Sequence, residues 1–123
     1  MTGLSVKVVL ETDPGAVCLR LSGDFDMVTE AAYFDALRKA QALQPASVRL
    51  DLSSLSFLDS GGLRCILQTH EWAAGSGVHL ILVGGPLNVQ RVFRISGVEK
   101  ELTFVEPAPL SSPVNLPGNK RER

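Results

Sequence analysis

The spacing of apolar residues alternates along this chain between the two-residue period of a β-strand and the period of about 3.6 residues of a helix. Strand-like segments at 6–10 and 17–21 flank an Asp-Pro-Gly turn at 13–15, which predicts an N-terminal β-hairpin. Three further strand-like segments follow, each after a helical pattern: 48–52, 78–83 and 102–105. This order predicts an α/β domain with a four- to five-stranded mixed sheet and about three α-helices.

The same patterns predict which side chains are buried. The first helix extends to about Leu43, and the second runs from about Ser60 to Ala74. The expected buried stripe of the second helix is Leu63, Ile66, Leu67 and Ala74. The strand residues expected in the core are Leu19, Leu21, Leu50, Leu52, Ile81 and Val83. Because the segment 78–83 is almost continuously apolar, we expect both of its faces to be covered.

Composition limits the class of protein. The chain has 123 residues, 45% of them apolar and 20% charged, which is typical of one globular domain. A formal net charge of −1 provides no field for nucleic acid and no polybasic membrane patch. Two isolated cysteines, Cys18 and Cys65, indicate a reducing cytoplasm and not a disulfide framework. Residues 1–106 are predicted to form the domain, and the proline-rich segment 107–123 is predicted to be a disordered tail.

The segment from Asp51 to Leu63, DLSSLSFLDSGGL, is the most informative stretch for function. An apolar strand leads into a serine-rich connection, and an amphipathic helix then opens after Asp59-Ser60-Gly61-Gly62. Ser60 is expected to cap this helix, although Asp59 could be the cap and leave Ser60 in solvent. The two glycines are expected to leave the backbone open to a partner or an anion. A bulky residue at Gly62 is therefore expected to block a partner without unfolding the domain.

Three loops are expected to meet at one edge of the sheet, because the carboxyl ends of parallel strands share an edge. These loops are 23–27, 59–62 and 84–86. Asp24 and Asp26, in the first loop, are either turn and cap residues or partner contacts. His70 and His79 have no cysteine or carboxylate at ligand spacing, so no metal and no cofactor is expected.

The chain resembles a known family, the STAS domains of bacterial anti-sigma-factor antagonists. LSGDFD at 21–26 resembles the family's turn before the first helix, and 51–63 resembles its Asp-Leu-Ser and Asp-Ser-x-Gly-Leu motif. Residues 89–93, with Gly97 and Val98, resemble the pattern of its third helix. The resemblance covers roughly residues 4–105.

The resemblance implies a STAS fold and a docking function. Such an antagonist binds an anti-sigma factor, often with a serine-kinase-like ATPase fold, and so releases a sigma factor that regulates transcription. The implied partner-binding residues are Asp24, Asp26, Asp59, Ser60, Gly61, Gly62 and Leu63. The family's phosphoacceptor would stand at Gly61, which has no hydroxyl. In the family, phosphorylation at this position adds charge that opposes docking. Because Gly61 cannot carry a phosphate, constitutive binding is expected here. Ser60 is the fallback acceptor.

Two other functions stay open. Some STAS proteins are non-phosphorylated accessory subunits of a lipid-transport ABC ATPase, which is compatible with Gly61. A hydrolase would use Ser60 as nucleophile, but the residue two before it is Leu58 where a nucleophile elbow has glycine. His70 and His79 also lie inside predicted elements and not in later loops. We therefore expect a non-enzymatic cytoplasmic regulator that is a monomer or weak dimer.

Overall fold

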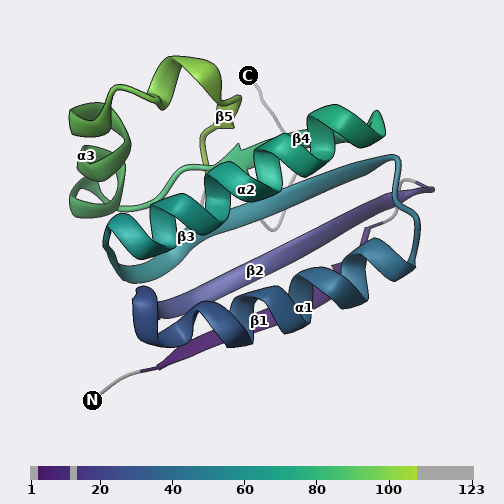
Figure 1. The fold of residues 1–123 in the computed structure, drawn as a ribbon, viewed down its shortest axis with the longest axis horizontal. Helices are drawn as coiled ribbons and strands as arrows, with labels where there is room; N and C mark the ends of the chain where they lie inside the picture. The colour runs from purple at the N-terminus through teal and green to yellow at the C-terminus, as the bar shows by residue number, and fades with distance from the viewer. Residues whose placement is uncertain (1–2, 12–13, 108–123) are drawn as a thin grey trace, which may run out of the picture.

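A computed structural model describes residues 3–11 and 14–107 of the chain (Figure 1). Strands alternate with helices as the sequence predicts. The elements in chain order are β1 (Leu4–Leu10), β2 (Ala16–Phe25), the 3₁₀ turn η1 (Met27–Thr29), α1 (Glu30–Ala42), β3 (Ser47–Leu58), α2 (Ser60–Ser76), β4 (His79–Val83), α3 (Leu87–Ser96), η2 (Glu99–Glu101) and β5 (Phe104–Val105). The predicted tail lies outside the described residues, except for Pro107.

The five strands form one mixed sheet in the order β1-β2-β3-β4-β5. β1 and β2 pair antiparallel as the predicted hairpin, from Leu10↔Val17 to Leu4↔Gly23, and the other neighbouring strands pair parallel. The hairpin turn is completed by Gly15, whose φ of 81° lies in the left-handed region that favours glycine. The predicted fold class is therefore confirmed.

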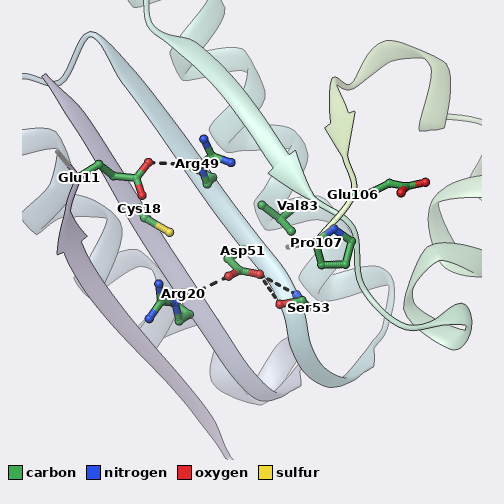
Figure 2. A pocket seen from close by; sticks show the side chains of 9 residues that line it. All are labelled: Glu11, Cys18, Arg20, Arg49, Asp51, Ser53, Val83, Glu106 and Pro107. Carbon is green, nitrogen blue, oxygen red and sulfur yellow. Dashed lines mark hydrogen bonds and ion pairs between the residues drawn. The ribbon is translucent and has the colours of Figure 1, made fainter. Parts of the chain in front are cut away.

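The helices lie on one face of this sheet because each crossover steps in the same direction. Right-handed connections from β2 to β3 and from β3 to β4 must place their helices on the same side. Figure 1 shows α1 and α2 side by side over that face, and α3 packs Val89 and Phe93 into the same core. The opposite face, called here the open face, carries Arg20, Arg49 and Asp51 (Figure 2).

This arrangement corrects the expectation for β4. Leu82 is fully buried under the helices, whereas Ile81 is only half-buried and lies outside the core cluster. Adjacent strand residues point to opposite faces, and no helix of the described residues covers the open face. The other predicted core residues of the strands are all buried. Leu19, Leu21, Leu50 and Leu52 belong to the core cluster, whereas Val83 lies outside it, on the same face of the sheet as Ile81.

The prediction that a serine-rich connection follows Leu52 is wrong. β3 continues through it to Leu58, in parallel register with β2 as far as the pair Phe25↔Leu58. Register shifts interrupt this ladder between Arg20 and Ser22 and between Gly23 and Asp24. Serines are compatible with this half of the strand because much of it is exposed and only every second or third side chain is buried.

The buried stripe of α2 is also different from the predicted one. Ala74 is exposed, and Thr69 is buried instead, with 1% of its surface accessible. The Thr69 hydroxyl donates to the Cys65 carbonyl at 2.8 Å and lies 2.7 Å from the Tyr33 hydroxyl of α1. A buried threonine is tolerated there because its hydrogen bonds are made inside the protein. The helix extends to Ser76, two residues beyond the predicted end at about Ala74, and Gly77, with φ of 70°, is its C-cap.

Candidate functional site

Two of the three candidate loops meet at the end of the sheet where β2 and β3 finish, called here the carboxyl edge. Asp24 pairs in register with Phe57, and Phe25 pairs with Leu58. The Asp59 N–H donates to the Phe25 carbonyl at 3.2 Å. The acidic turn after β2 and the start of α2 are therefore neighbours in space.

The third loop does not join them. β4 ends opposite Asp51, so Gly84–Pro86 lies near the middle of β3, where a Cβ on Gly85 would be 2.9 Å from the Leu52 carbonyl oxygen. Leu52 precedes Asp59 by about 23 Å of extended strand. α3 partly spans this distance, because the Asn88 side chain donates to the Ser56 carbonyl at 2.9 Å.

Asp59 is the N-cap of α2. Its Oδ1 accepts hydrogen bonds from the N–H groups of Gly61 at 2.8 Å and Gly62 at 3.0 Å. Ser60 is exposed in the first turn and makes no cap hydrogen bond. The expectation that Ser60 caps the helix is therefore wrong, and the alternative that Asp59 caps it is correct. Asp59 and not Ser60 caps the helix because the extended backbone of Asp59 points its carboxylate back over the first turn.

The two glycines are buried, so they do not expose the backbone to a partner. A Cβ on Gly62 would lie 2.5 Å from the Phe25 carbonyl oxygen and 2.6 Å from the Leu58 Cδ1 atom. The close approach that glycine permits is made by the protein's own β2 strand. A bulky residue at Gly62 would therefore unfold the domain and not only block docking, which corrects the sequence-based expectation.

Gly61 supports the η1 turn. A Cβ at this position would lie 3.0 Å from the Met27 backbone nitrogen and 3.1 Å from the Met27 Cα atom. Leu63, the last of the predicted contact residues, belongs to the hydrophobic core and is 6% exposed. Of the α2 residues that the resemblance implicates, Ser60 is the one with an exposed side chain.

Asp26 has the structural role of a cap. Its Oδ1 accepts from the N–H groups of Val28 at 3.0 Å and Thr29 at 3.1 Å, and the Asp26 N–H donates to the Thr29 hydroxyl oxygen at 3.0 Å. This reciprocal capping box fixes η1. Asp24 is partly buried, and its carbonyl accepts from the Thr29 hydroxyl at 3.1 Å.

Sequence reasoning missed two features of this edge, an exposed apolar pair and an ion pair. Met27 and Val28 are 67% and 84% exposed on η1. Arg64 of α2 forms an ion pair with Glu30 of α1, with 2.7 Å between Arg64 Nη2 and Glu30 Oε2. The signal for the apolar pair was present, since two adjacent large apolar residues follow a capping aspartate directly.

The open face holds a second polar region (Figure 2). Arg49 Nε lies 3.3 Å from Glu11 Oε1, and Arg20 Nε lies 3.7 Å from Asp51 Oδ2. These ion pairs surround a shallow cavity of about 330 Å³. Its lining residues are Glu11, Cys18, Arg20, Arg49, Asp51, Ser53, Val83, Glu106 and Pro107. Burial, with a smaller contribution from nearby carboxylates, raises the pKa of the Cys18 thiol, which disfavours a reactive thiolate.

Residues 3–11 and 14–107 contain neither a metal-binding cluster nor a membrane-spanning helix. No group of three or more histidine, cysteine or acidic side chains in this part of the chain could hold a metal ion. No helix in the same part is long and apolar enough to cross a membrane.

Comparison with known proteins identifies the family. The model of the STAS domain family matches residues 7–109. The anti-sigma-F factor antagonist RsfB of Mycobacterium tuberculosis is 29% identical over 96 residues, which are 78% of each protein. An anti-sigma factor antagonist from Mycobacterium paratuberculosis has a similar structure, with a TM-score of 0.68, 27% identity, and coverage of 85% of this chain and 87% of the other.

The unphosphorylated form of the anti-sigma factor antagonist SpoIIAA shares the fold. Its TM-score is 0.66 at 21% identity, with 82% of this chain and 88% of the other covered. The length of the family match and the agreement in fold lead to one conclusion. The chain belongs to the STAS domain family.

Proposed function

We propose that this protein is an anti-sigma-factor antagonist, which binds an anti-sigma factor of serine-kinase-like ATPase fold and so releases a sigma factor. The observation that carries this proposal is the similarity to named antagonists over most of the chain. The carboxyl edge supports it, because the acidic turn after β2 and the start of α2 are neighbours there. We take residues 1–106 as the docking unit, with 107–123 outside it, in a cytoplasmic monomer or weak dimer.

The protein acts by docking and not by catalysis. Ser60 is exposed at the start of α2, and His70 lies ten residues later on the same helix, about 15 Å away along the axis. A nucleophilic serine needs a base within hydrogen-bond reach, and this helix does not supply one.

Binding is constitutive in this proposal. Gly61 has no hydroxyl, and the Met27 backbone occupies the space next to it, so a phosphate cannot form there. Ser60 is the fallback acceptor because its side chain is exposed. Regulation then depends on the amount of antagonist or on competition with a relative that can be phosphorylated.

The test uses purified full-length protein and the anti-sigma factors encoded in the same genome. We expect the protein to bind one of them and to displace its sigma factor in a competition assay. Intact-mass measurement after incubation with that anti-sigma factor and ATP should show no added phosphate. A phosphate mapped to Ser60 would contradict constitutive binding. Binding only to the ATPase of a lipid-transport ABC complex would replace the proposed function.

A further inference from the structure

Two adjacent large apolar side chains stand out on the surface of the carboxyl edge. Met27 is 67% exposed and Val28 is 84% exposed. The other large exposed apolar residues of the described segments are not adjacent to one another in the sequence. Single exposed apolar residues are normal on a protein surface, whereas grouped ones mark interaction sites.

The backbone of this pair is held in a fixed position. Asp26 caps the turn from one side, by accepting from the Val28 and Thr29 N–H groups. Gly61 lies directly against the Met27 backbone on the other side. A turn whose backbone is already fixed loses less conformational entropy when it binds, so it is suited to anchor a complex.

The surroundings of the pair are acidic. Residues 23–30 and 59–64 contain four carboxylates, of Asp24, Asp26, Glu30 and Asp59, and one basic residue, Arg64. Arg64 is already paired with Glu30. The whole chain has a formal net charge of only −1, so negative charge is concentrated at this edge.

We propose that Met27 and Val28 form the apolar anchor of the docking surface, and that the anti-sigma partner presents an apolar pocket bordered by basic side chains. This inference rests on the proposed function and specifies its partner surface. A few residues that become buried near the centre of an interface carry most of the binding free energy, and complementary charges around them guide association.

The charge distribution argues against two other occupants. A second copy docked through the same turn would bring two acidic surfaces together, which is unfavourable. An anionic membrane surface would repel the same carboxylates. A partner with basic residues around an apolar pocket would bury the apolar pair and would also attract the carboxylates around it.

The experiment measures the affinity of full-length variants for the anti-sigma factors of the same genome. The double variant Met27→Ser/Val28→Ser keeps both backbone N–H groups, so the Asp26 cap stays intact. We expect its Kd to rise about 100-fold, because two apolar side chains no longer become buried. Met27→Leu, which conserves the apolar surface, should restrict the change to about threefold.

The matched control is Leu10→Ser. Leu10 is 70% exposed, similar to Met27, but it lies at the opposite end of the sheet, in register with Val17. Its Kd should equal that of the native protein. The unfolding free energy of each variant, measured with urea, shows that the fold is unchanged.

Raising the ionic strength from about 0.05 M to 0.5 M should slow association with the native protein, because opposite charges are screened. Native-like binding by the double serine variant would overturn the inference and leave the proposed function in place. If the native protein binds none of the anti-sigma factors, the proposed function fails and this inference fails with it.

Discussion

The carboxyl edge and the open face both contain several carboxylates, but these carboxylates have different partners. At the edge, Asp26 and Asp59 accept hydrogen bonds from backbone N–H groups of the elements that follow them. On the open face, Glu11 and Asp51 pair with Arg49 and Arg20. The first arrangement positions the backbone. The second offsets charge between Arg20 on β2 and Asp51 on β3, and between Arg49 on β3 and Glu11, which follows β1.

The consequence for function follows from this difference. Because the edge carboxylates fix the backbone of η1 and α2, the side chains of Met27, Val28 and Ser60 are left exposed. On the open face the charged side chains pair with one another across the sheet. A surface whose apolar side chains are exposed on a fixed backbone can dock a partner, whereas a surface of paired charges gains little by being covered.

The largest effect is expected at the contact between β2 and α2. Gly62→Ala should lower the free energy of unfolding by about 3 kcal/mol, because its Cβ would overlap the Phe25 carbonyl oxygen at 2.5 Å. The control is Gly75→Ala in the same helix, where a Cβ meets no atom within 4 Å. That variant should raise stability by up to about 1 kcal/mol. Urea unfolding compares the two, and equal effects would contradict the tight contact.

A second effect concerns alkaline pH. Burial, followed by the nearby Glu30 charge, raises the pKa of the Cys65 thiol from 9.0 to about 11. A raised thiol pKa means that the folded state favours the protonated thiol. The contribution of Cys65 to the free energy of unfolding is therefore complete below pH 9 and is lost as the pH rises toward 11. The free energy of unfolding should fall by about 2 kcal/mol by pH 11 from this group alone.

Cys65→Ala isolates this contribution. Its stability should be lower at neutral pH because a packed side chain is removed, but it should fall less steeply above pH 9 than that of the native protein. Parallel slopes in the two proteins would show that Cys65 does not titrate as described. Cys18, whose thiol pKa is also raised by burial, would account for part of the slope that remains.

A smaller effect separates the two possible caps of α2. Asp59→Ala should cost about 1 kcal/mol of stability, because the Gly61 and Gly62 N–H groups lose their acceptor. Ser60→Ala is the control and should change stability by less than about 0.5 kcal/mol, since Ser60 is exposed and caps nothing. Thermal unfolding of both variants measures this, and a larger loss from Ser60→Ala would reverse the assignment.

The smallest effect is expected on the open face. Asp51→Asn removes the charge opposite Arg20, whose side chain is 53% exposed, while an amide oxygen can still accept from the Ser53 backbone N–H. Such pairs contribute about 0.5 kcal/mol or less. The affinity for the proposed anti-sigma partner should be unchanged. A clear loss of affinity in this variant would move the docking surface from the carboxyl edge to the open face.

The sequence alone determined the order of the elements and most of the core. Alternation at Leu19, Leu21, Leu50 and Leu52 identified the buried faces of two strands, because in a strand the side-chain direction depends only on local geometry. Gly97, which the resemblance includes in the pattern of the third helix, is the C-cap of α3, and its left-handed φ of 79° depends only on local geometry. The motif at 51–63 also identified the family before the fold was known.

The tertiary structure decided which face of each helix or strand packs against another part of the domain. Ile81 is only half-buried because all crossovers place their helices on the other face, and no local pattern in β4 records that. Gly62 looked like an opening for a partner, but the strand that fills its space lies more than thirty residues earlier in the chain. Exposure and close approach depend on residues distant in sequence, whereas periodicity and capping depend on neighbours. The sequence could therefore predict that the loops at 23–27 and 59–62 lie at one edge of the sheet, and only the packed structure could show that Met27 and Val28 are the side chains exposed there.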